Sequence, residues 1–109
     1  MASQIVKIVV FAPESHADAV RKALGEAGAG QIGKYRHCTF SSKGIGRFTP
    51  EAGANPHLGS IGTPEAVPEE RIETVCPRAI LPKVIRAMKE VHPYEEVAYD
   101  IYSLENLTE

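Results

Sequence analysis

The densest group of chemically reactive side chains is the run His92-Pro93-Tyr94-Glu95-Glu96, which places an imidazole, a phenol and two carboxylates within five residues. Imidazole and carboxylate groups bind divalent metal ions and move protons. A metal site normally needs three or four protein ligands, so this run would need further groups from elsewhere in the chain or from a neighbouring subunit. The alternative is structural: His92 would interact with a helix dipole, and Tyr94 would pack over a sharp corner.

Other polar residues could complete such a site. His37 falls in a predicted strand, whereas Asn55 and His57 fall in a segment rich in glycine and proline. We expect a ligand site lined by the following side chains: His37, Asn55, His57, His92, Tyr94, Glu95 and Glu96. A divalent metal ion is one candidate occupant, with His37, His92 and Glu96 as its ligands. The carboxylates favour a metal ion, a cationic ligand or a hydroxyl-rich ligand over a phosphate, whose charge they would repel. His16 is expected to be solvated.

Two further patterns resemble functional motifs but lack the context that those motifs need. The segment 28–34 fits GxGxxG, yet it follows a predicted helix and precedes a strand, whereas a dinucleotide fingerprint follows a strand and opens a helix. We therefore interpret it as a helix-to-strand connection. Cys38 is expected to lie with Phe40 on the buried face of a strand, as an inert thiol. No serine or cysteine has an evident base beside it, so the sequence predicts no catalytic set.

The order of predicted elements indicates the fold. Strands are expected at 4–11, 35–42, 71–76 and 97–102, because β-formers alternate there. Helices are expected at 15–27, with Ser15 as N-cap and Gly28 as C-cap, and from Leu81 to Val91, where apolar residues recur every three or four positions. This order is the ferredoxin-like βαββαβ pattern, an α+β sandwich whose antiparallel sheet has both helices on one face.

The segment 43–69 separates the two central strands and is expected to be a long excursion. Loops of this length are usually functional or mobile, although a pair of short strands extending the hairpin is an equally acceptable interpretation. The first and last strands carry apolar residues on both faces, which is typical of strands that are buried on both sides. We therefore expect the second sheet face to meet another subunit.

Composition excludes several classes of protein. The chain of 109 residues is 43% hydrophobic and suits one domain, residues 1–109, with a core. Its formal net charge of -2 and its scattered basic residues argue against a nucleic-acid partner. It has no membrane-spanning apolar run and no signal-peptide pattern at its start, and its two cysteines form no disulfide framework. We expect a cytoplasmic protein with no membrane partner.

Several motifs together resemble the YqfO-type, Nif-three-like family. They are AGAGQIGKYRHCTFS (27–41), GIGRF (44–48), GANPHLG (53–59), RIET (71–74) and HPYEEVAYDIY (92–102). The resemblance is to the domain inserted in longer members, which is similar to CutA and the PII signalling proteins. It implies a CutA/PII-like fold and a trimer in which a ligand lies in a cleft between subunits. The segments that build a dinuclear metal centre in longer members are not found here, so we expect a stand-alone insert domain.

Three functions remain open at this point. The first is a non-enzymatic oligomeric module that binds a small ligand or a divalent metal, in the manner of PII and CutA. The second is a metal-dependent hydrolase of the Nif-three-like type, which the missing segments disfavour. The third is a protein-interaction domain that docks through the excursion 43–69.

Overall fold

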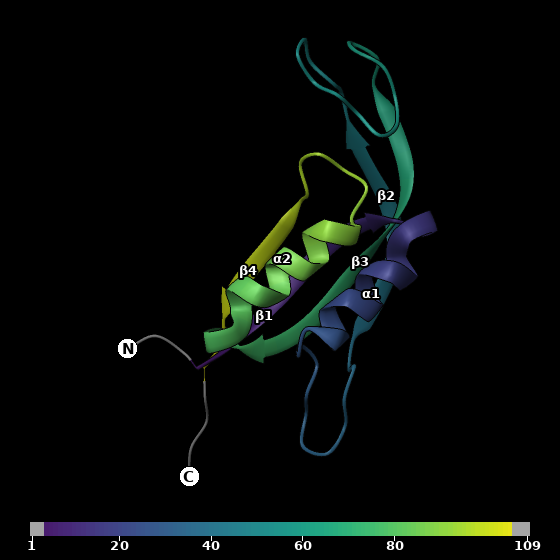
Figure 1. Cartoon of the computed structure of the whole chain (residues 1–109). Coiled ribbons are helices and arrows are strands. Elements are labelled where there is room, and N and C mark those ends of the chain that lie inside the picture. The colour runs from purple at the N-terminus through teal and green to yellow at the C-terminus, as the bar shows by residue number, and fades with distance from the viewer. Residues whose placement is uncertain (1–3, 106–109) are drawn as a thin grey trace.

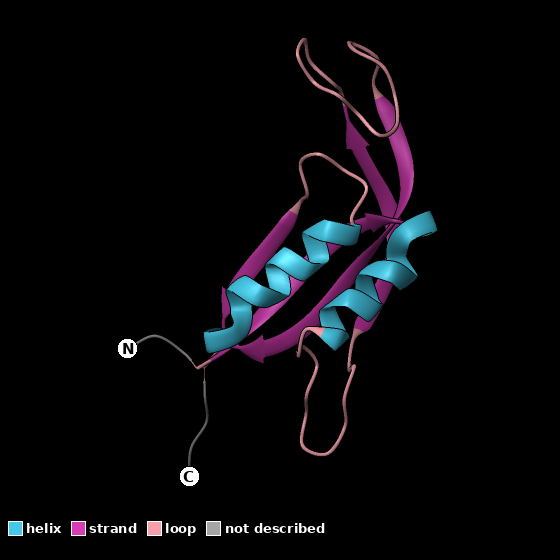
Figure 2. Ribbon diagram, in the orientation of Figure 1, coloured by secondary structure: helices cyan, strands magenta, loops and turns pink. Residues whose placement is uncertain are grey.

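The computed structural model describes residues 4–105 and has an α+β architecture. Its elements are β1 (Ile5–Pro13), a 3-10 turn (Glu14–His16), α1 (Ala17–Glu26), β2 (Phe40–Phe48), β3 (Glu65–Pro77), a second 3-10 turn (Arg78–Ile80), α2 (Leu81–Val91) and β4 (Tyr99–Ser103). The four strands form one antiparallel sheet in the order β2-β3-β1-β4. Both helices lie on the same face of the sheet (Figures 1 and 2). The predicted ferredoxin-like fold is confirmed.

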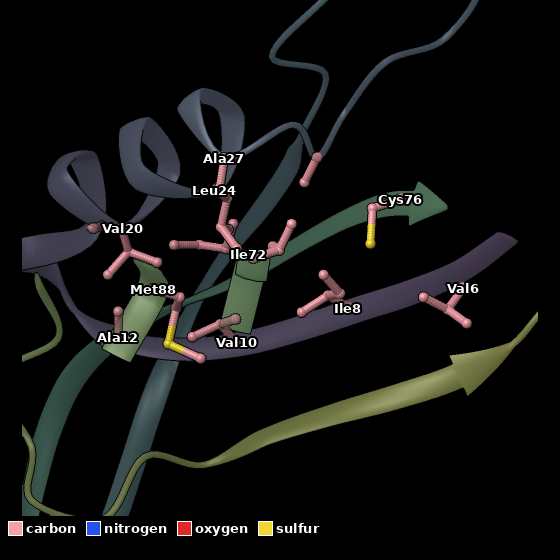
Figure 3. Packing of buried hydrophobic residues seen from close by; sticks show 13 residues of the cluster. Val6, Ile8, Val10, Ala12, Val20, Leu24, Ala27, Ile72, Cys76 and Met88 are labelled. Carbon is pink, nitrogen blue, oxygen red and sulfur yellow. The ribbon is translucent and has the colours of Figure 1, made fainter. Parts of the chain in front are cut away.

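The core lies between this face and the two helices. Alternate residues of β1 point into it, among them Val6, Ile8 and Val10, all of which are fully buried. Leu24 of α1 and Met88 of α2 cover them from above (Figure 3). Among the described residues no helix is long and apolar enough to cross a membrane.

Both predicted helices are present, but the predicted N-terminal cap of α1 is not. Each begins after a 3-10 turn, and neither start has a side-chain cap. The expectation that Ser15 caps α1 was wrong, because its hydroxyl instead bonds to the Nδ1 atom of His16 at 2.8 Å. Gly28 does follow the C-terminus of α1, with the positive φ of 112° that favours glycine there.

The second and third strands, β2 and β3, extend further toward the tip than the sequence patterns indicate. They pair from Phe40 opposite Glu73 to Phe48 opposite Glu65, so the excursion shortens to a tip loop, residues 49–64. The extended-hairpin interpretation is therefore the correct one. The predicted strand ranges omit these extensions because Gly44, Gly46 and Pro68 weaken the β pattern. The hairpin of β2, the tip loop and the first half of β3, here called the arm, projects beyond the helices (Figure 1).

The sheet face opposite the helices, here called the open face, is less apolar than expected. Register places Lys7 and Val9 of β1 on it, beside Glu73 of β3. Lys7 and Glu73 form an ion pair with an N–O distance of 3.1 Å. Val9 is fully buried within a single chain, so it offers no surface to a partner. Tyr102 of β4 stays 45% exposed on this face.

The loop from α1 to β2, residues 27–39, replaces the expected start of the second strand. His37 has φ of 58°, outside the extended region, so the backbone cannot continue as a strand through it. The expected placement of Cys38 and Phe40 on the buried face was also wrong. Cys38 is half-buried in the loop, and Phe40 pairs with Glu73 on the open face, where it is 68% exposed. The segment 28–34 does connect a helix to a strand, as predicted.

Candidate functional site

The candidate site lies where the tip loop meets the corner that joins α2 to β4, residues 92–98. These segments are far apart in the sequence, but the backbone N–H of Asn55 donates a hydrogen bond to Oε1 of Glu95 at 2.7 Å. The tip loop is closed on itself by a hydrogen bond from the Gly62 N–H to the carbonyl of the buried Pro50, at 2.7 Å. At the base of the arm, Arg21 of α1 forms an ion pair with Glu70 of β3. The arm is thus fixed at both ends.

Aromatic side chains gather at the meeting point, and Tyr94 lies next to three of them. Its ring centroid lies 5.0 Å from that of His92, 6.2 Å from that of Phe48 and 6.3 Å from that of His57. The His57 ring also packs edge-on against His16, with centroids 5.6 Å apart. His57 therefore bridges the corner and the start of α1.

Tyr94 is held in place by a carboxylate. Its hydroxyl donates a hydrogen bond to Oε2 of Glu69 on β3 at 2.9 Å. Burial of the phenol, and then this bond and the negative charge of Glu69, raise the pKa of Tyr94 far above its ordinary value. The hydroxyl therefore remains protonated and acts as a donor, and Tyr94 is unsuited to proton transfer near neutral pH.

His92 has a structural role. It is buried, with 6% of its surface exposed. Its Nε2 bonds to the carbonyl oxygen of Phe11 at 2.8 Å, and its Nδ1 accepts a hydrogen bond from the Tyr94 N–H at 3.2 Å. A carbonyl can only accept and an amide N–H can only donate, so both bonds require the neutral ring with its proton on Nε2. Burial lowers the pKa of His92, in agreement with a neutral ring.

Within one chain, the residues expected to hold a metal ion lie apart. Both nitrogens of His92 are occupied by hydrogen bonds. His37 lies at the other end of the molecule, in the loop that contacts the carboxyl end of β3, and its ring faces Gly25 of α1. Residues 4–105 contain no group of three or more His, Cys, Asp or Glu side chains placed to hold a metal ion. The expected set of His37, His92 and Glu96 is therefore not brought together within one chain.

The tip loop and the corner enclose an open hollow of about 120 Å³, here called the tip–corner hollow. Most of its lining is apolar or aromatic. The residues that line it are Phe48, Pro50, Ala54, Pro56, His57, Leu58, Tyr94, Glu95 and Glu96. Its wall thus includes two carboxylates but neither lysine nor arginine.

The structure brings together most of the predicted site residues and adds others. The Asn55 backbone and the side chains of His57, Tyr94, Glu95 and Glu96 meet at the tip–corner hollow, whereas His37 does not. Sequence reasoning missed Phe48, Glu69 and His16. Extending the hairpin to Phe48 would have placed this ring beside the tip loop. His16 would have followed from the topology, since the end of β1 lies beside the corner through the Phe11–His92 bond.

A comparison with curated proteins finds related sequences in longer bacterial proteins, while no family model matches the chain. It is 54% identical over 102 residues to the "GTP cyclohydrolase 1 type 2 homolog" of Halalkalibacterium halodurans, covering 94% of this chain and 27% of that protein. The "Bacillus cereus protein related to NIF3" has 55% identity and a TM-score of 0.83, over 97% of this chain and 27% of that one. The chain is homologous to the insert domain of these NIF3-related proteins. It spans about a quarter of their length.

More distant solved structures share the fold of this chain. CutA from Archaeoglobus fulgidus, a "periplasmic divalent cation tolerance protein", has a TM-score of 0.69 and 19% identity, covering 95% of this chain and 87% of that one. The GlnK–ATP complex of Bacillus subtilis has a TM-score of 0.60 and 13% identity, covering 94% and 84%. The fold is therefore CutA/PII-like, as the sequence motifs implied.

Proposed function

We propose that this NIF3-related domain is a non-enzymatic, self-associating module that binds a small ligand in the tip–corner hollow. The observation that supports this most directly is the Asn55–Glu95 hydrogen bond, which closes the tip loop over the corner and leaves an apolar hollow between them. A loop that serves only as a connection has no need to fold back onto a second loop. Concave, mostly apolar sites with a few polar groups are typical of ligand-binding sites.

The size and charge of the hollow favour a ligand smaller than a nucleotide. At about 120 Å³ it is smaller than the roughly 300–1,000 Å³ of sites that hold drug-sized molecules. Glu95 and Glu96 would also repel a phosphate chain. The ATP of the GlnK complex is therefore a poor guide to the ligand of this domain within one chain.

The second candidate is the activity in the name of the curated relatives, "GTP cyclohydrolase 1 type 2 homolog". Homology favours it, but the chain matches only 27% of such a protein. At the tip–corner hollow, His92 and Tyr94 are each committed to internal hydrogen bonds, so neither is free to transfer a proton to a ligand there. We therefore place binding before catalysis.

Filling the hollow should abolish ligand binding without unfolding the domain. Ala54 is an exposed residue that lines the hollow, so Ala54→Trp would occupy the space with an indole ring. Saturation-transfer NMR with a library of small amines, alcohols and acids should detect binders to the parent chain that are lost in this variant. The control is Ala52→Trp, in the same loop but outside the lining. A hit list unchanged by Ala54→Trp would contradict the proposal.

Self-association should use the open face, and a trimer is the assembly that resemblance to CutA and PII implies. Tyr102 is 45% exposed on that face, so Tyr102→Glu should place a charge in the contact between subunits and shift the mass measured by light scattering toward one chain. Tyr35→Glu is the matched control, since Tyr35 is 75% exposed in the loop 27–39 outside the sheet. A parent chain that is monomeric at micromolar concentration would contradict the proposal, as would dissociation by Tyr35→Glu alone.

A further inference from the structure

We propose that the tip–corner hollow is selective for a small alkylammonium group. This inference rests on the proposed binding function and names its ligand chemistry. The lining combines aromatic rings with carboxylates, and neither lysine nor arginine lines it. Aromatic faces attract cations through the ring quadrupole, and carboxylates attract them directly. An apolar molecule would contact the aromatic rings but gain nothing from the carboxylates. An anion would be attracted by neither.

Three aromatic rings from different segments line the hollow. Phe48, His57 and Tyr94 all line the hollow, and they come from β2, the tip loop and the corner. The Phe48 ring is inclined by 56° to that of Tyr94 and the His57 ring by 49°, with centroids 6.2 Å and 6.3 Å away. The three rings thus lie close together at the hollow without stacking face to face. A cation within about 6 Å of such ring centroids is attracted to them.

The carboxylates are free to meet a cation. Glu95 uses Oε1 to accept the Asn55 N–H, which leaves its Oε2 available. Glu96 is exposed, and within the part of the chain that the structure describes no hydrogen bond or ion pair to its carboxylate occurs. Three of the four cations on β2 and α1 are paired elsewhere: Lys43 with Glu14, Arg21 with Glu70 and Lys22 with Glu26. The fourth, Arg47, precedes Phe48 on β2 and does not line the hollow, because neighbouring residues of a strand point to opposite faces. The hollow therefore keeps a negative potential that an outside cation would neutralise.

The volume limits the size of the cation. A cavity of about 150 Å³ accommodates benzene, so about 120 Å³ suits a head group with a few carbon atoms. A bare divalent metal ion matches the hollow less well, because it needs several oxygen or nitrogen ligands converging on one point. An alkylammonium group instead presents methyl or methylene surface to the rings and its charge to the carboxylates.

The decisive test compares choline with 3,3-dimethylbutan-1-ol, which has the same shape but no charge. Each is titrated into the ¹⁵N-labelled domain, and amide shifts of residues 48–58 and 94–96 are followed. Choline should bind about tenfold more tightly than the alcohol, as a cation–aromatic contact with carboxylate support predicts. Added salt should weaken choline binding, because the carboxylates are exposed and therefore screened.

Variants connect this preference to the hollow. Glu96→Gln should reduce choline affinity severalfold and leave the alcohol unaffected. Glu90→Gln, the same charge change on an α2 residue outside the lining, is the control. Equal binding of choline and the alcohol would overturn the ammonium inference while supporting the hollow as a binding site. If neither choline nor the alcohol bound, both the binding site and its ammonium preference would be contradicted for ligands of this size. Choline binding unchanged by Glu96→Gln would overturn only the ammonium inference.

Discussion

Replacing His92 by leucine is expected to lower the free energy of unfolding by about 2–3 kcal/mol, although leucine is apolar and the site is buried. The variant would leave the Phe11 carbonyl and the Tyr94 N–H without their partner. An unpaired buried polar group costs its full desolvation, which exceeds the gain from one more apolar side chain. The same change should release the corner that carries Tyr94 and Glu95.

Urea denaturation at neutral pH measures this loss. The control is His37→Asn, because His37 is exposed and asparagine tolerates its positive φ of 58°. That variant should stay within about 0.5 kcal/mol of the parent, as surface substitutions usually do. If His92→Leu proved as stable as His37→Asn, the corner would not depend on the buried imidazole, and the structural role assigned to it would be wrong.

The pH dependence of stability provides a second readout of the same residue. Burial lowers the pKa of folded His92 below its ordinary value of 6.5, so the unfolded chain binds the proton more readily. The stabilising contribution is complete above pH of about 6.5 and is lost progressively as the pH falls below it. His16, His57 and Glu69 also face this ring, but they remain in the variant. The decrease in parent stability between neutral and mildly acidic pH should therefore be smaller in His92→Leu.

The core and the topology were predictable because local patterns and tertiary burial agree there. Alternation along Val6, Ile8 and Val10 gives the buried face of β1, and the helical spacing of Val84 and Met88 gives that of α2. The short βαββαβ order then leaves few topologies open. Where glycine and proline interrupt the alternation, as in β2 and the first half of β3, the sequence pattern weakens although backbone pairing continues.

The candidate site was predictable only in part, since its geometry depends on backbone features that residue types do not reveal. The positive φ of His37 ends the expected strand, and the register that pairs Phe40 with Glu73 leaves this imidazole near the carboxyl end of β3, far from the tip loop. The neutral state of His92 follows from its burial and from the Tyr94 N–H that its Nδ1 accepts, and its tautomer follows from a carbonyl of β1; no local pattern indicates these contacts. In contrast, a corner rich in polar groups beside a long excursion was enough to indicate that Asn55 and His57 would approach the corner, where they contact Glu95 and Tyr94.

Gly30→Ala is expected to destabilise the domain by about 3 kcal/mol or more, through two independent effects. Gly30 has φ of 83°, a conformation that is costly for a residue with a Cβ. A Cβ at this position would also lie 2.7 Å from both the backbone nitrogen and the backbone oxygen of Cys38, which cannot move aside as a flexible side chain could. Gly30 holds the loop 27–39 to the sheet, because its N–H donates to the Val75 carbonyl at 2.7 Å and its carbonyl accepts from the Cys38 N–H at 2.9 Å.

The matched control is Gly44→Ala in β2, where an added Cβ meets nothing within 4 Å and φ is not positive. This change should be neutral or slightly stabilising, because glycine in a strand costs about 0.5–1 kcal/mol relative to alanine. Thermal unfolding of both variants distinguishes the two cases. A Gly30→Ala variant as stable as Gly44→Ala would mean that the loop does not approach β3 as described. The glycines of 28–34 would then require another explanation, and the phosphate-binding interpretation that their spacing first suggests would have to be tested directly.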